Sequence, residues 1–289
     1  MEDITVSDIL SATGGTILSG DENTVLLDIC INSKEIKEGD LFVPIIGTNV
    51  DAHKFIEGAL EVGAATLTSQ HNNVVVADKP YIRVNDTVKA LQDIGSYIRN
   101  RYNIPVVGVT GSVGKTTTRE MITTALRTKY KTFHTKGNFN SQIGVPITLS
   151  KLSREDEIAV LELGMSEPGQ IVTLSKMVKP SLAVVTTIGV AHIEYMKTQE
   201  NIRKEKLSIV EGMSDDGVLL LNGDDLMLAQ MRDKMPGNTL FYGCEDWCDY
   251  KARKIVYREG KSFFELVYKD ECINIELNAL GKHNVANCV

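Results

Sequence analysis

Residues 106–118 read VVGVTGSVGKTTT, and this stretch decides the fold. An apolar run, Val106–Val109, leads into a turn with two glycines and then into Lys115, where a helical pattern begins. This order predicts a phosphate-binding loop, because glycines let backbone N–H groups turn toward an anion and the helix dipole favours negative charge there. Gly111 precedes Gly114 by only three residues, so the loop departs from the G-x-x-x-x-G-K-[ST] spacing. A plain glycine-rich turn at a helix start is the alternative interpretation.

Three further apolar runs follow the loop, each ahead of a segment with helical spacing. They are Ile158–Leu161, Leu182–Val185 and Val218–Leu221. Continuous apolar strands that alternate with helices are typical of a parallel sheet covered on both faces, so the sequence predicts the α/β class. Between Tyr250 and Leu280 the apolar residues recur at every second position, which indicates an added region of antiparallel hairpins.

The first 83 residues differ from the rest in having short, mixed strand and helix patterns. An amphipathic helix is expected from Thr87 to Tyr102, with its apolar residues on one face. We therefore predict two domains, a small mixed one over residues 1–83 and a larger phosphate-loop domain over residues 84–289.

Composition excludes several classes of protein. Of the 289 residues, 43% are hydrophobic and 24% are charged, which is ordinary for a globular chain. The net charge of −7 argues against a sequence-independent grip on nucleic acid or on an anionic membrane. No apolar run approaches the roughly 18 residues of a membrane-spanning helix, and the acidic N-terminus has no signal core, so we expect a cytoplasmic protein. We also expect a monomer. The five cysteines lack zinc-site spacing and are expected to be free thiols.

Polar residues follow the phosphate loop and the next two strands, where the ligand crevice of an open α/β sheet lies. Lys115 would offer its charge to the β- and γ-phosphates, and Thr116 could hold a magnesium ion. Glu162 closes one strand and could ligate magnesium or orient a water molecule, or it could simply face solvent. His192 follows the next strand, and the alternative interpretation is a structural histidine.

Six motifs along the chain carry a family resemblance. They are TGSVGKTTT at 110–118, GNFNSQIGVP at 137–146, ELG at 162–164, AHIE at 191–194, NGDD at 222–225 and GKHN at 281–284. Their order resembles that of the Mur ligases, ATP-dependent enzymes that form amide bonds in peptidoglycan precursor synthesis. Within the family, the second and fourth motifs are similar to the member that adds D-alanyl-D-alanine to a UDP-linked tripeptide.

The N-terminal region resembles the domain of this family that binds the UDP end of the substrate. The residues that the resemblance implies for this binding are Ser33, Lys34, Gly47, Asn49, Asp51 and His53. Lys34 stands where the family usually has arginine, which loses a bidentate phosphate contact. Ala52, Val113 and Thr187 are further departures from the usual family residues.

The resemblance also implies the cofactors ATP and Mg²⁺ and assigns roles around the phosphate loop. The residues implied to bind ATP are Gly111, Ser112, Val113, Gly114, Lys115, Thr116, Thr117, Asn138 and Asn140, with Asn222, Asp225, His283 and Asn287 near the adenosine. The residues implied to be catalytic are Lys115, Glu162, His192 and Lys206. One magnesium ion would be held by Thr116 and Glu162, and a second by His192 and Lys206.

Lys206 has this role only as a carbamate, the CO₂ adduct that the matching lysine of the family carries. A lysine ammonium would otherwise avoid a magnesium site, and the helix around it reads as a solvated charged face. Lys204 is close by, but the spacing Glu200-x-Ile202-x-x-x-Lys206 matches the family and favours Lys206.

The implied substrates are UDP-N-acetylmuramoyl-tripeptide and D-alanyl-D-alanine, with no nucleic-acid partner and no membrane insertion. Family members carry a C-terminal domain for the incoming dipeptide, whereas this sequence stops within an apparent helix start at residues 281–289. We therefore expect a fragment without that domain, inactive by itself. The alternatives are a Mur ligase that adds the third residue, a folylpolyglutamate synthase-like ligase, and a non-catalytic module that binds a nucleotide or a UDP-sugar.

Overall fold

The computed structural model divides the chain into two compact units. It describes residues 1–73, 76, 78–235 and 237–289. Unit 1 comprises Met1–Asn103 and Gln142–Glu155, and unit 2 comprises Ile104–Ser141 and Asp156–Val289. The first segment thus ends at Asn103 and not near residue 83, because helix α3 (Thr87–Asn100) packs against α1 (Val6–Thr13) and α5 (Gly144–Leu149) of unit 1.

Unit 1 is built on a five-stranded sheet in the order β2-β7-β6-β5-β4. Its strands are β2 (Thr16–Ser19), β4 (Asp28–Cys30), β5 (Asp40–Phe42), β6 (Ala65–Thr68) and β7 (Tyr81–Arg83). Only β2, at one edge, runs antiparallel to its neighbour. A separate antiparallel pair joins β1 (Ile4–Thr5) to β3 (Val25–Leu26), and the helices include η1 (Ala52–Phe55) and α2 (Ile56–Val62).

Helix α3 has the amphipathic face that its sequence predicts. Asp86 caps its N-terminus by accepting hydrogen bonds from the backbone N–H groups of Val88 and Lys89. Leu91, Ile94 and Ile98 recur at helical spacing and are buried in the main apolar core of the unit. The helix therefore belongs to unit 1 through its core contacts.

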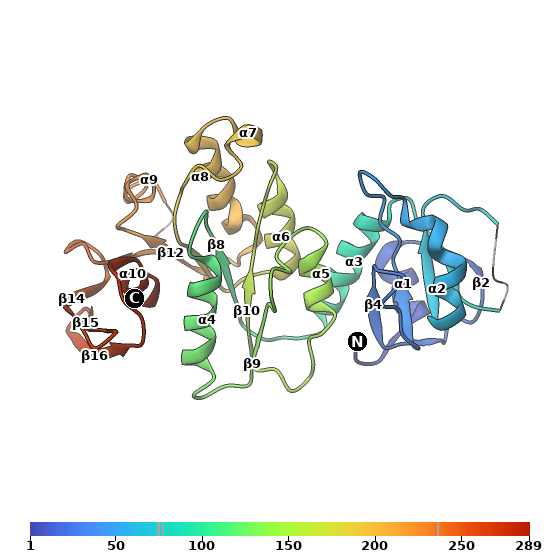
Figure 1. Cartoon of the computed structure of the whole chain (residues 1–289), viewed down its shortest axis with the longest axis horizontal. Coiled ribbons are helices and arrows are strands. Elements are labelled where there is room, and N and C mark those ends of the chain that lie inside the picture. The colour runs from blue at the N-terminus through green and yellow to red at the C-terminus, as the bar shows by residue number, and fades with distance from the viewer. Residues whose placement is uncertain (74–75, 77, 236) are drawn as a thin grey trace. The chain divides into compact units, whose positions relative to one another are not determined.

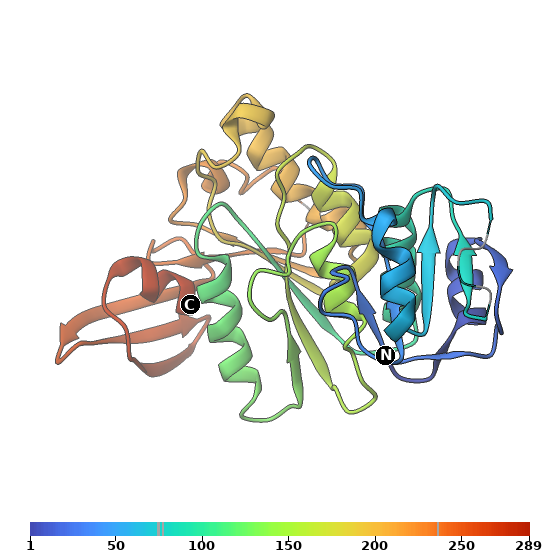
Figure 2. The ribbon, with the colours of Figure 1, turned by 45° about the vertical axis from the view of Figure 1, so that its right-hand side comes forward.

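Unit 2 contains a nine-stranded sheet in the order β16-β15-β14-β13-β12-β11-β8-β10-β9 (Figures 1 and 2). The parallel strands are β8 (Val106–Thr110), β9 (Thr132–His134), β10 (Ile158–Glu162), β11 (Leu182–Val185), β12 (Val218–Asn222) and β13 (Thr239–Gly243). The hairpin strands are β14 (Tyr250–Arg258), β15 (Lys261–Tyr268) and β16 (Glu271–Leu277), drawn in red in Figure 2. These strands confirm the predicted α/β class and the added antiparallel region.

Helices cover both faces of this sheet, as strand β8 illustrates. Val107 and Val109 pack on the apolar side of α4 (Lys115–Leu126). Gly108 faces the other way, where a Cβ would lie 3.3 Å from Ile209 of η2 (Ser208–Gly212). The other helices of the unit are α6 (Gln170–Val178), α7 (Ile193–Met196), α8 (Gln199–Leu207), α9 (Leu226–Ala229) and α10 (Lys282–Cys288).

Two further expectations can be compared with the structure. Across the described residues, no helix combines the length and the apolar character that crossing a bilayer requires. The five cysteines are free, as predicted.

Candidate nucleotide site and the N-terminal polar network

The phosphate loop joins β8 to α4 and needs glycine at two positions. Gly111 has φ +153°, and a Cβ there would collide with Thr186 Oγ1. Gly114 forms the N-terminal cap of α4 in the left-handed conformation, with φ +87°. Side chains are disfavoured in both backbone conformations, so the glycines create the loop.

Thr187 holds the loop from the neighbouring strand end. Its carbonyl accepts a hydrogen bond from the N–H of Ser112 at 2.8 Å, and its hydroxyl accepts one from the N–H of Val113 at 3.1 Å. The chain itself therefore uses these two amides. The N–H groups of the first turn of α4 have no intrahelical acceptors, and they remain the natural donors for an anion.

Lys115 begins α4 and folds back over the loop. Its Nζ donates to the carbonyl of Gly111 at 2.9 Å and approaches that of Ser112 at 3.5 Å. Burial lowers the pKa of Lys115, while the charge of Glu162 acts in the opposite direction. The cation is thus held at the mouth of the loop by weak neutral acceptors.

Glu162 ends β10 with 1% of its surface exposed. Its Oε2 accepts hydrogen bonds from Thr116 Oγ1 at 3.0 Å and from Arg119 Nη1 at 3.2 Å. Its Oε1 accepts one from Asn140 Nδ2 at 2.7 Å. The glutamate is therefore buried and anchored, which differs from a strand-end residue facing solvent. Sequence reasoning missed Arg119, although it lies one helical turn after Lys115 and so falls on the same side of α4.

A cavity of about 180 Å³ opens beside the loop. It is lined by Gly111, Ser112, Lys115, Asn140, Ser141, Gly164, Met165, Ser166, Gln170, Ala191, His192 and Lys206. The structure thus brings five predicted side chains, those of Ser112, Lys115, Asn140, His192 and Lys206, to one cavity. Asn138 is exposed and is not among the lining residues.

Lys206 is the most unusual group in the cavity. It is 3% exposed, and burial together with the positive charge of Lys115 lowers its pKa to about 7. Lys204, the alternative position, is exposed on the same helix. The preceding Glu205 accepts hydrogen bonds from the N–H groups of Gly169 and Ile171, both at 2.8 Å, and so fixes α8 to the start of α6.

His192 directly precedes α7. It has the left-handed backbone conformation, with φ +63°, and is exposed.

Asn222 and Asp225 stabilise the loop after β11. Asn222 Nδ2 donates a hydrogen bond to the carbonyl of Thr186 at 2.8 Å, and Asp225 Oδ2 accepts one from the N–H of Ile188 at 2.8 Å.

Helix α10 brings another predicted residue to the phosphate loop. Asn287 Oδ1 lies 3.0 Å from the position that a Cβ would take at Gly114, and α10 packs beside α4. His283 lies in the first turn of the same helix and is exposed.

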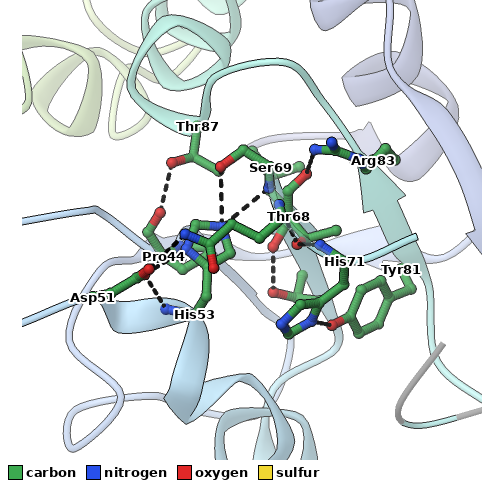
Figure 3. Close-up of polar contacts among 12 residues, drawn as sticks. Pro44, Asp51, His53, Thr68, Ser69, His71, Tyr81, Arg83 and Thr87 are labelled. Carbon is green, nitrogen blue, oxygen red and sulfur yellow. Dashed lines mark hydrogen bonds and ion pairs between the residues drawn. The ribbon is translucent and has the colours of Figure 1, made fainter. Parts of the chain in front are cut away.

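Two of the predicted residues of unit 1, Asp51 and His53, belong to a different kind of cluster (Figure 3). His53 is 2% exposed, and its Nδ1 lies 2.7 Å from Asp51 Oδ1. Its Nε2 accepts the backbone N–H of Ser69 at 3.0 Å, which assigns the proton to Nδ1. Gln70 Nε2 donates to the second oxygen of Asp51 at 2.5 Å. Both ring nitrogens of His53 are therefore used within the chain, where they connect the 51–53 turn to the end of β6.

The other predicted residues of unit 1 lie on surface loops. Lys34, Gly47 and Asn49 are exposed, and Ser33 is half-buried. The N–H of Gly47 donates to the carbonyl of Val50 at 2.9 Å, which closes the loop before Asp51. These residues offer polar groups to solvent, whereas the contacts of Asp51 and His53 hold the loop that precedes Asp51 in place.

A strand, a glycine loop and a helix, with a buried carboxylate and two lysines beside them, define a P-loop nucleotide-binding protein. Comparison with protein families narrows this class. The Mur ligase middle domain matches residues 109–289, and the catalytic domain of the Mur ligase family matches residues 28–99. The chain belongs to the Mur ligase family.

Individual relatives agree with this assignment. The UDP-N-acetylmuramoyl-tripeptide–D-alanyl-D-alanine ligase of Bacillus subtilis is 36% identical over 99% of this chain and 62% of its own length. The MurF ligase of Thermotoga maritima in complex with ADP superposes with a TM-score of 0.82 at 32% identity, covering 91% of this chain and 61% of that one. The corresponding ligase from Acinetobacter baumannii gives a TM-score of 0.89 at 29% identity over 98% and 63% of the two chains. The chain thus spans about 62% of the length of the first of these relatives.

Proposed function

We propose that this chain carries the nucleotide site of an ATP-dependent ligase that joins D-alanyl-D-alanine to UDP-N-acetylmuramoyl-tripeptide. The observation that carries the proposal is the convergence of Lys115, Glu162 and Lys206 on the phosphate loop and its cavity. Relatives of 29–36% identity named for this reaction support the choice over a ligase that adds the third residue.

The proposed reaction has two steps. The tripeptide carboxylate attacks the γ-phosphorus of ATP, which forms an acyl phosphate and releases ADP. The amine of D-alanyl-D-alanine then attacks the acyl carbon, forms the amide, loses a proton and expels phosphate. Lys115 and the amides at the start of α4 would stabilise negative charge on the transferring group, and positioning would supply most of the rate.

The residues present fit magnesium as the accompanying cation. The Thr116 hydroxyl and the Glu162 carboxylate are already 3.0 Å apart, and both are oxygen ligands. In the described part of the chain, no cluster of three or more His, Cys, Asp or Glu side chains forms a metal site. Mg²⁺ matches so sparse a set, because it is usually held by one or two carboxylates together with substrate phosphates and water. It would neutralise charge on the phosphates.

Lys206 fits the second metal position only after modification. A pKa of about 7 leaves much of the amine neutral at neutral pH, and a neutral amine can attack CO₂ to form a carbamate with release of one proton. The product would replace a buried cation by an anion beside Lys115 and His192. We infer that this modified side chain, with His192, serves the second magnesium ion.

Unit 1 is proposed to bind the UDP end of the substrate. Its exposed loop residues, Lys34, Gly47 and Asn49 together with half-buried Ser33, would supply the contacts. Asp51 and His53 would hold this loop in place and would not themselves need to reach the ligand.

The direct test uses the full-length protein with ATP, UDP-N-acetylmuramoyl-tripeptide and D-alanyl-D-alanine. We expect phosphate release that requires all three substrates, together with a pentapeptide product by mass spectrometry. Phosphate release without amide formation, or activity with a free amino acid in place of the dipeptide, would contradict the proposed acceptor.

A further inference from the structure

Arg119 is a buried cation in the second turn of α4 to which the proposed reaction assigns no role. Its surface is 3% exposed, and its partner Glu162 is 1% exposed. Burying a charge pair is expensive, and the attraction between its members often fails to repay the lost hydration. A pair retained at this depth therefore calls for an explanation other than stability.

The contacts of Arg119 connect three parts of unit 2. Its Nη1 donates to the carbonyl of Gly137 at 3.0 Å and to Glu162 Oε2 at 3.2 Å. Its Nη2 donates to Glu120 Oε1 at 2.5 Å. Its Nε is buried without a hydrogen-bond partner. The guanidinium thus ties α4 to the end of β10 and to the loop after β9, at the cost of one unsatisfied donor.

The charge of Glu162 is balanced within this arrangement. Thr116 and Asn140 donate hydrogen bonds to the carboxylate, but both are neutral. Arg119 supplies the positive charge at ion-pair distance, and it meets Oε2, the same oxygen that Thr116 contacts. The oxygen that lies nearest the proposed metal ligand Thr116 is therefore the one that the arginine also occupies.

We propose that Arg119 is a positioning residue, the resident counter-ion that holds Glu162 oriented and neutralised when no metal ion is present. Arg119 and Mg²⁺ then compete for the negative charge of Glu162, which keeps the metal site closed until phosphates arrive with the ion. This inference rests on the proposed function, because the magnesium role of Glu162 belongs to that function.

The test is thermal unfolding without nucleotide, in EDTA and across a range of Mg²⁺ concentrations. For the wild type we expect little response to Mg²⁺. Arg119→Met should unfold at a lower temperature in EDTA, because Glu162 becomes a buried unpaired charge, and Mg²⁺ should restore much of the loss. The half-effective Mg²⁺ concentration should fall by about tenfold, equivalent to about 1.4 kcal/mol of removed competition.

Three variants separate this role from a merely structural one. Arg119→Lys keeps the charge and should stay insensitive to Mg²⁺, although it loses the two-pronged contact with Gly137 and Glu120. The double variant Arg119→Met with Glu162→Gln should lose the Mg²⁺ response. Arg127→Met, an exposed arginine at the end of the same helix, is the matched control and should behave as the wild type.

An equal loss of stability with and without Mg²⁺ in Arg119→Met would overturn the inference. So would a Mg²⁺ response in Arg119→Lys as large as that in Arg119→Met. If Arg119→Met fails to fold, Arg119→Gln replaces it under the same criteria. Binding of ADP with Mg²⁺ to the wild type is measured in parallel, because its absence would contradict the proposed function whatever the arginine variants show.

Discussion

The cavity of unit 2 and the His53 network of unit 1 both contain ionisable side chains, but they differ in how fully other segments of the chain satisfy those side chains. In the cavity, Lys206 is buried and Lys115 is half-buried, and both have lowered pKa values. In the network, both ring nitrogens of His53 and both oxygens of Asp51 have partners within the chain. The cavity therefore keeps hydrogen-bonding groups available for a ligand, whereas the network uses its hydrogen-bonding groups to hold a loop.

This difference shows why a sequence motif does not reveal the role of each of its residues. The Gly-Lys-Thr and Asp-Ala-His motifs both contribute to the family resemblance, the second with Ala52 as a departure. Partners from distant segments decide between them, because Ser69 and Gln70 satisfy the network. Among the described residues, by contrast, Lys206 Nζ has no hydrogen-bond partner, and Lys115 Nζ contacts only carbonyls of its own loop. Burial without partners points to a ligand, and burial with partners points to structure.

The largest effect should come from Lys115. Lys115→Ala should lower the rate of the proposed ligation by at least about 100-fold, because a charge aimed at the transferring phosphate is lost. The measurement is steady-state phosphate release, with Lys204→Ala as the exposed-lysine control. Near wild-type turnover in Lys115→Ala would contradict the contrast between a ligand-binding cavity in unit 2 and a structural His53 network in unit 1.

Lys206→Ala should also nearly abolish the proposed ligation, and small carboxylic acids such as acetate should partly restore it. The restored activity would reflect an anion in the position of the proposed carbamate. Turnover is assayed with and without acetate, beside Lys204→Ala. A fully active Lys206→Ala variant together with an inactive Lys204→Ala variant would move the role to the other lysine.

A pH-dependent stability effect should distinguish Lys206 from exposed lysines. Its pKa is about 7 in the folded protein and near the ordinary 10.5 in the unfolded chain. Between these values the unfolded chain binds the extra proton, so this group makes stability rise with pH across the window. Below pH 7 the folded state carries the full cost of the buried charge.

Lys206→Met should therefore raise the melting temperature most below pH 7, and the gain should shrink as the pH approaches 10.5. Thermal unfolding in CO₂-free buffer measures this change, with Lys204→Met as the control. A gain that does not change with pH would mean that Lys206 titrates like a surface lysine.

A smaller effect separates the two histidines. His53→Ala should lower the free energy of unfolding by about 1–3 kcal/mol, because it removes a buried ring, leaves the part-buried N–H of Ser69 without its acceptor and takes one partner from Asp51 Oδ1. His192→Ala, an exposed position, should stay within roughly 0.5 kcal/mol of the wild type. Urea unfolding of both variants measures the contrast, and equal losses would mean that the network is not structural.

The sequence predicts the parallel core of unit 2 well, because β8, β10, β11 and β12 are continuous apolar runs. It misses β9 and β13, since Thr132–His134 is short and partly polar, and Thr239–Gly243 is a short run that begins with threonine and ends with glycine. It also misses the return of residues 142–155 to unit 1, because that return depends on packing between α5 and α3.

The candidate site shows the same limit. Lys115, Glu162, His192 and Lys206 can be picked out by motif and family spacing. Helical spacing from Lys115 places Arg119 on the same side of α4, but only its contact with Glu162 on β10 shows its importance. Glu205 and Ser69 are likewise marked by a partner on another element and not by a pattern along the chain.

Calorimetric titration of ADP with Mg²⁺ tests the central claim most directly. The claim is that the unit 2 cavity is the nucleotide site while the His53 network is structural. We predict binding to the wild type, at least about tenfold weaker binding to Lys115→Ala, equivalent to about 1.4 kcal/mol, and unchanged affinity in His53→Ala below its melting temperature. Unchanged affinity in Lys115→Ala, or loss of binding in folded His53→Ala, would contradict the account.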